Sequence, residues 1–138
     1  MSDNIDGLAQ LANTFFEKGE PYDSGCNENQ IDHFLAKSRL LDPTKPVCIV
    51  KDWTWCDLDT TADEFQQISA FGLQAVIIKS DFVIKDEACR FDYGNWVRTS
   101  YLKEFHFNCL FETQNTVYLL VGDGTRKAIN SDQLKRFF

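Results

Sequence analysis

The stretch Phe105-His-Phe-Asn-Cys-Leu-Phe-Glu-Thr-Gln-Asn-Thr-Val-Tyr-Leu-Leu-Val121 decides the predicted fold. In its first part, apolar side chains occupy alternate positions, at Phe105, Phe107, Cys109 and Phe111. This alternation predicts one half-buried strand over residues 105–113. Gln114-Asn115 predicts a tight turn, and the apolar run that follows predicts a second strand over 116–121. The stretch therefore predicts an antiparallel pair of strands.

Short β-rich runs continue on both sides of this pair. They predict further strands at 73–78, 82–84, 89–91, 96–99 and 125–129. Gly122-Asp123-Gly124 predicts another tight turn, between the strands that end at 121 and begin at 125. Consecutive strands joined by short turns indicate a mostly antiparallel β-meander from residue 73 onward.

Residues 1–72 show helical spacing instead. Their apolar residues predict helices over 3–18, 28–40 and 61–71. Asn27 is a plausible cap of the second helix, and either Thr60 with Asp63 or Thr61 with Glu64 gives a capping box for the third. Residues 47–50 predict a short strand, and residues 52–57 predict an irregular segment. Residues 130–138 predict a short C-terminal helix. We therefore expect an α+β fold in a single domain over 1–138, with a helical part (1–72) packed on a β-rich part (73–129).

Charge is unevenly distributed along the chain. The net charge is −7, and residues 1–69 carry 13 acidic and 5 basic side chains, whereas residues 70–138 carry 8 and 9. An acidic surface repels nucleic acid and membranes and attracts basic proteins, although acidity also serves solubility alone. No apolar run approaches the ~20 residues of a membrane helix. The start of the chain lacks a signal-peptide pattern, so we expect a cytoplasmic protein with no membrane contact.

Enzymatic and metal-binding patterns are weak. The five cysteines are irregularly spaced and form no zinc motif, and His106 and Cys109 would lie on opposite faces of one strand. Asp57 and Asp59 lack the glycine and glutamate spacing of a calcium loop. We therefore expect no catalytic residue, no cofactor and no metal. Two alternatives stay open, an enzyme with a cysteine or carboxylate centre and a nucleic-acid binder with a basic face.

The runs Gly94-Asn-Trp-Val-Arg-Thr-Ser100 and Phe111-Glu-Thr-Gln-Asn-Thr-Val-Tyr-Leu-Leu120 resemble a family of small uncharacterised proteins from proteobacterial genomes and mobile elements. The resemblance covers about residues 75–127, and it brings no assigned chemistry. The mobile-element association implies one sharp hypothesis. Small acidic proteins of this kind antagonise host defence complexes, as anti-CRISPR proteins do.

We therefore expect a non-enzymatic, acidic protein-binding module that occludes a basic, nucleic-acid-handling surface such as that of a CRISPR effector. Exposed tryptophans rimmed by carboxylates would form the interface, which comprises Asp52, Trp53, Trp55, Asp57, Asp59, Asp63 and Glu64. A possible second surface comprises Trp96, Arg98, Arg126 and Lys127. We do not expect this surface to bind nucleic acid directly.

Overall fold

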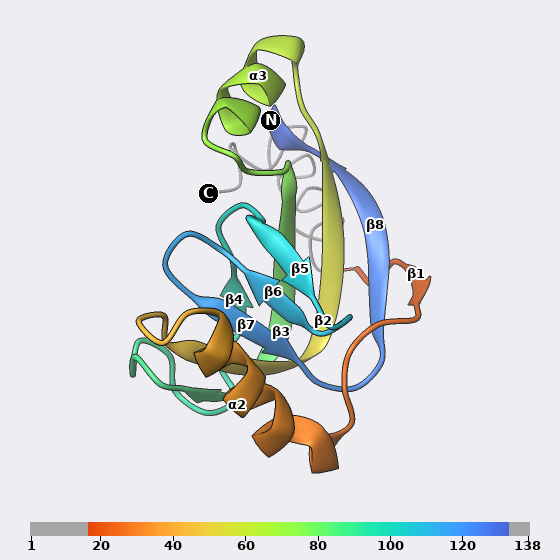
Figure 1. Ribbon diagram of the computed structural model, residues 1–138. Helices are drawn as coiled ribbons and strands as arrows, with labels where there is room; N and C mark the ends of the chain where they lie inside the picture. The colour runs from red at the N-terminus through yellow and green to blue at the C-terminus, as the bar shows by residue number, and fades with distance from the viewer. Residues whose placement is uncertain (1–16, 133–138) are drawn as a thin grey trace.

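The computed structural model describes residues 17–132, and strands dominate this part of the chain (Figure 1). The strands are β1 (Glu20–Tyr22), β2 (Val47–Asp59), β3 (Val76–Asp86), β4 (Val97–Arg98), β5 (Glu104–His106), β6 (Leu110–Glu112), β7 (Val117–Leu120) and β8 (Gly124–Asn130). The helices are the 3-10 turn η1 (Glu28–Gln30), α2 (Ile31–Leu41) and α3 (Ala62–Ala70). The predicted helix over 3–18 and most of that over 130–138 lie outside the described residues.

The strands of residues 17–132 form a single mixed sheet that curls into a half-barrel (Figure 1). Its main path runs β1-β8-β2-β7-β6-β5, and β3 joins the other edge of β2 and carries β4. The predicted α+β arrangement, with N-terminal helices packed on an antiparallel meander, is therefore wrong. A curled sheet, and not a helical layer, carries most of the core.

β2 is the strand around which the sheet is built. Sequence reasoning divided it into a short strand and an irregular segment, but it runs without interruption from Val47 to Asp59. It pairs antiparallel with β3 along one edge. Along its other edge it pairs parallel with β7 over its first half and with β8 over its second half. Asp52, with a φ of 50°, lies between these two pairings.

β7 and β8 do not form the predicted hairpin. They follow each other along one edge of β2, with Val47–Val50 beside β7 and Thr54–Asp59 beside β8. The turn at 122–123 joins them, and Gly122 has a φ of 74°. Such parallel pairing depends on contacts between segments far apart in sequence, which a local turn pattern does not reveal.

The stretch 105–113 is a hairpin and not one strand. Phe107 and Asn108 have φ values of 52° and 59°, the left-handed conformation of a tight hairpin turn, and they reverse the chain between β5 and β6. The predicted strand at 89–91 is also wrong. Backbone amides of Ala88 and Arg90 donate to the Asp86 carboxylate and hold this segment in a turn.

The helices at 28–40 and 61–71 are confirmed with small shifts of boundary. A capping box between Asn27 and Gln30 starts η1, which leads directly into α2. α2 packs on the β6–β7 side of the sheet through Ile31, Phe34 and Leu35. α3 connects the end of β2 to β3 and lies at one end of the half-barrel (Figure 1).

Candidate protein-binding site

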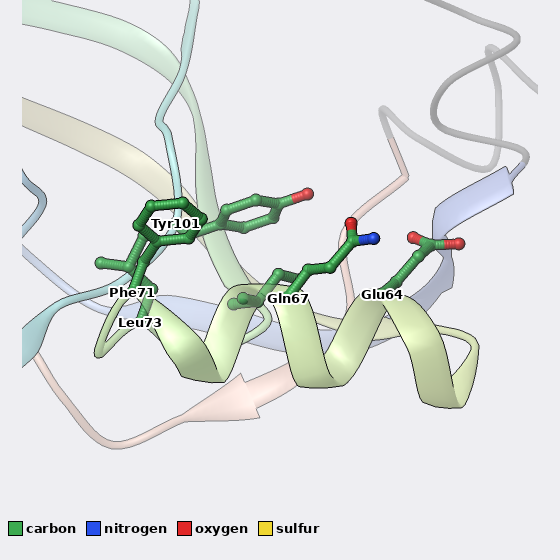
Figure 2. A pocket seen from close by; sticks show the side chains of 6 residues that line it. Glu64, Gln67, Phe71, Leu73 and Tyr101 are labelled. Carbon is green, nitrogen blue, oxygen red and sulfur yellow. The ribbon is translucent and has the colours of Figure 1, made fainter.

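A pocket of about 220 Å³ opens beside α3 (Figure 2). Its apolar lining is made by Ile68, Phe71, Leu73 and Tyr101, and Glu64 and Gln67 supply its polar side. Phe71 is 73% exposed, and Phe65 on the same helix is 57% exposed. Contiguous exposed apolar surface on a small protein commonly marks an interaction site. This end of the molecule therefore carries the composition of a docking surface.

The short length of α3 leaves these aromatic side chains outside the core. Ile68 is the buried residue of this nine-residue helix. The last helical residue is Ala70, and Gly72, with a φ of 73°, turns the chain away from the helix. The Leu73 amide then donates to the Ile68 carbonyl at 3.2 Å. Phe71 is thus the C-cap residue and lies at the mouth of the pocket.

Acidic residues surround the start of α3. The Thr61 hydroxyl accepts a hydrogen bond from the Glu64 amide at 3.2 Å and caps the helix, as the sequence predicted. The Glu64 carboxylate accepts from Ser131 Oγ at 3.2 Å and is half-buried. Asp59 and Asp63 are exposed. Carboxylates at this position also interact favourably with the helix dipole, so they are compatible with the helix that presents them.

Trp53 and Trp55 lie in the core, so their predicted exposure is wrong. They are 1% and 6% exposed, and the indole Nε1 of Trp53 donates to the Gly122 carbonyl at 3.1 Å. Alternation along β2 directs both rings to the inner face. There the Trp55 ring packs edge-on against the Phe111 ring, with 5.5 Å between the ring centroids. Asp52 is exposed at the irregularity that precedes Trp53. The exposed aromatic side chains next to the predicted carboxylates are therefore Phe65 and Phe71 of α3 and its C-cap, and not the tryptophans of β2.

Asp57 is neutralised by a member of the predicted second surface. Its two carboxylate oxygens accept from Arg126 Nε at 2.7 Å and Nη2 at 2.9 Å. The Arg126 guanidinium also lies over the rings of Tyr22 and Trp55, at 5.1 and 5.4 Å from their centroids. Both charges are thus engaged within the protein.

Comparison with known families matches residues 23–136 to DUF6957, a domain of unknown function. The chain belongs to this family. The matched residues include the α3 pocket and the whole sheet except β1. An uncharacterised family was expected from the sequence, and this part of the expectation is confirmed. No curated protein and no solved structure matches the chain.

The other residues of the predicted second surface lie on or next to separate strands of the DUF6957 domain. Arg98 belongs to β4, which pairs with β3, whereas Lys127 belongs to β8. β2 and β3 lie between these two strands. Trp96, at the entry to β4, is 44% exposed. The Lys127 ammonium donates to the Glu17 carbonyl, and burial lowers the pKa of this lysine. The structure therefore does not gather these cations into one cluster.

The cysteines considered as nucleophiles are buried. Burial raises the pKa of the Cys48 thiol to about 12 and that of Cys56 to about 11. A hydrogen bond with Cys26, and to a smaller extent burial, also raises the pKa of the Cys109 thiol. Thiols in such surroundings stay protonated and are weak nucleophiles near neutral pH. The geometry thus favours packing roles for all three.

Within residues 17–132, no helix is long and apolar enough to span a membrane.

One cluster escaped sequence reasoning. Glu104 and Glu112 face each other across the β5–β6 pair, and His106 follows on the same face of β5. Their side-chain oxygen and nitrogen atoms lie within 4.8 Å of one another. The sequence pattern that marks this cluster is Glu-x-His followed by a glutamate across a tight turn. Placing residues 105–113 on one strand concealed it, because Glu112 then appeared remote from Glu104.

Proposed function

We propose that this DUF6957 domain is a non-enzymatic protein-binding module whose docking surface is the α3 pocket and its acidic border. The observation that carries the proposal is an apolar pocket lined by the exposed Phe71 and by Glu64, on a helix that also presents the exposed side chains of Phe65 and Asp63. Apolar anchors with a charged rim are the usual composition of an interface hot spot.

The complementary partner is a protein with an apolar side chain in basic surroundings. That side chain would enter the space between Phe71, Leu73 and Tyr101, where its burial yields about 25 cal/mol for each Å² removed from water. Asp59 and Asp63 would attract the surrounding cations and accelerate encounter more than they increase affinity. The apolar contact therefore supplies most of the affinity, and the carboxylates supply partner selection.

The sharper form of this proposal concerns a basic surface that handles nucleic acid. Carboxylates placed where phosphates would bind allow a small acidic protein to occlude such a surface. Antagonism of a CRISPR effector, as by an anti-CRISPR protein, is the specific case that the sequence resemblance suggested. The excess of acidic residues in 1–69 supports this choice of partner class.

Matched surface variants test the docking surface. Phe71→Ala, and separately the pair Asp59→Lys and Asp63→Lys, should reduce the amount of each specific partner that an affinity column retains. Leu40→Ala and Asp32→Lys are the controls, because both residues are exposed on α2 and neither lines the pocket. Equal retention by pocket and control variants would reject this surface as the interface.

The partner class is tested with a purified CRISPR effector. The wild-type domain should inhibit binding of target DNA to the effector, and the Asp59→Lys/Asp63→Lys variant should inhibit it less. The inhibition should weaken as salt rises, because the attraction is electrostatic. If the domain does not inhibit the effectors of its native host, the antagonist role is rejected. The protein-binding proposal would then depend on the column experiment alone.

A further inference from the structure

The Glu104–His106–Glu112 cluster has the donor atoms of a metal site. His106 Nε2 lies 2.9 Å from Glu112 Oε1 and 3.9 Å from Glu104 Oε2. One imidazole nitrogen and two carboxylates are donors that zinc-type ions accept. The three residues also come from a two-stranded hairpin whose register is set by the pairing of Phe105 with Phe111. The donors are thus held together by backbone geometry.

The placement of the two glutamates needs a cation. Like charges directly opposite on neighbouring strands destabilise a sheet. Glu112 is 7% exposed, so solvent screens it poorly, whereas the Glu104 side chain is 68% exposed. Glu112 therefore places its carboxylate in a largely buried position, in contact with Lys45 and His106.

Lys45 only partly compensates this charge. Its ammonium donates to Glu112 Oε2 at 2.6 Å and to the Thr113 carbonyl at 2.9 Å. Lys45 thus contacts Oε2 of Glu112, whereas Oε1 of the same carboxylate contacts His106. Lys103 contributes a further positive charge near Glu112.

We propose that Glu104, His106 and Glu112 bind a divalent transition-metal ion of the zinc type, beside the Lys45 ammonium on the outer oxygen of Glu112. This site is independent of the α3 docking surface. Zinc–ligand distances are about 2.0–2.2 Å, so binding would require the exposed Glu104 side chain to move toward His106 and the His106–Glu112 contact to open. Three protein ligands leave a coordination position for water or for a donor from another molecule. The sequence predicted no metal, so the proposal reverses that expectation.

Titration of the metal-free protein with Zn²⁺ tests the site by calorimetry. We expect one Zn²⁺ per chain, with affinity reduced at least about tenfold in His106→Gln and in Glu104→Gln. His33→Ala is the matched control, because His33 is the other histidine of the chain and is exposed on α2. Glu104→Gln changes an exposed side chain and should stay folded. Equal Zn²⁺ affinity in wild type and Glu104→Gln, or a loss in His33→Ala as large as that in His106→Gln, would overturn the proposal.

Lys45→Met provides a test with the opposite sign. Removing the ammonium beside Glu112 should increase Zn²⁺ affinity, because the positive charge of Lys45 no longer repels the metal ion. Zn²⁺ should also raise the melting temperature of this variant more than that of the wild type, since a ligand stabilises the state that binds it. A purely structural ion-pair cluster predicts instead that Lys45→Met is destabilised and that Zn²⁺ does not restore its stability. That result would overturn the proposal.

Discussion

Trp53 in β2 and Phe71 at the end of α3 are both large aromatic residues, but they have opposite surroundings. Trp53 is 1% exposed at the centre of the sheet, whereas Phe71 is 73% exposed at the end of α3. β2 has a strand on each edge and core side chains on its inner face. α3 buries little more than Ile68. Strand pairing, and not residue type, decides which aromatic residues a partner can reach.

Trp53→Ala should cause the largest loss on the β2 side of this comparison. The change removes a fully buried ring and its hydrogen bond to Gly122, so we expect a loss of about 3–5 kcal/mol in the free energy of unfolding. Chemical denaturation measures this loss. Trp96→Ala is the control, since Trp96 is 44% exposed and should cost less. Equal losses in the two variants would contradict the assignment of Trp53 to the core.

Asp86→Asn tests a buried charge next to β2. Burial acts to raise the pKa of Asp86, but hydrogen bonds from the Arg90 side chain and from the amides of Arg90 and Ala88 outweigh it and lower that pKa. The lowered pKa means that Asp86 stabilises the fold above its unfolded-state pKa, and that this contribution is lost as pH falls through the folded-state value. We expect Asp86→Asn to cost about 1.5–3 kcal/mol at neutral pH.

The same variant should flatten the acid limb of the stability profile below about pH 4, the unfolded-state pKa of aspartate. Denaturation at a series of pH values measures this slope. Asp63→Asn is the control, because Asp63 is exposed on α3. If the acid limb keeps the wild-type slope in Asp86→Asn, the buried carboxylate is not its source.

The Asp57–Arg126 pair lies between the two extremes, with side chains 38% and 44% exposed. A double-mutant cycle with Asp57→Asn and Arg126→Gln should give a coupling of about 0.5–1 kcal/mol, because solvent screens a pair at the surface. The coupling should fall as salt is added. A coupling of zero at low salt would show that the bidentate contact does not contribute to stability.

Phe71→Ala should have the smallest effect on stability and therefore gives the sharpest contrast with Trp53. We expect a change within about 0.5 kcal/mol, as for other exposed positions. The same change should reduce partner binding by about 2 kcal/mol or more if Phe71 is an interface hot spot. A loss of stability comparable with that of Trp53→Ala would mean that Phe71 supports the fold and would remove the basis of the docking surface.

Local patterns predicted the local features well. Asn27 is the N-cap of η1, which leads into α2, as expected, and Thr61, one of the two predicted candidates, caps α3. The strands at 116–121 and 125–129 correspond to β7 and β8. Each of these features depends on residues within a few positions of one another, so the sequence contains the whole interaction.

The candidate sites required more than local patterns. Asp59, Asp63 and Glu64 were predicted at an interface, and the structure adds the pocket and Phe71 beside them. The exposure of Trp53 and Trp55 was predicted wrongly, because a break in the pattern at Asp52 concealed the continuity of β2. The Glu104–His106–Glu112 cluster was missed for a similar reason, because an unrecognised turn at Phe107-Asn108 brings its members together.

The sequence by itself determined the capped helices, the acidic N-terminal half and most β-rich segments of this DUF6957 domain. Only the tertiary structure decided that β7 and β8 both pair in parallel with β2, that its tryptophans are buried, and that α3 leaves its phenylalanines exposed. The physical reason is the range of the interactions. Caps and turns form between neighbouring residues, whereas sheet order and burial depend on contacts between segments brought together only when the whole chain folds.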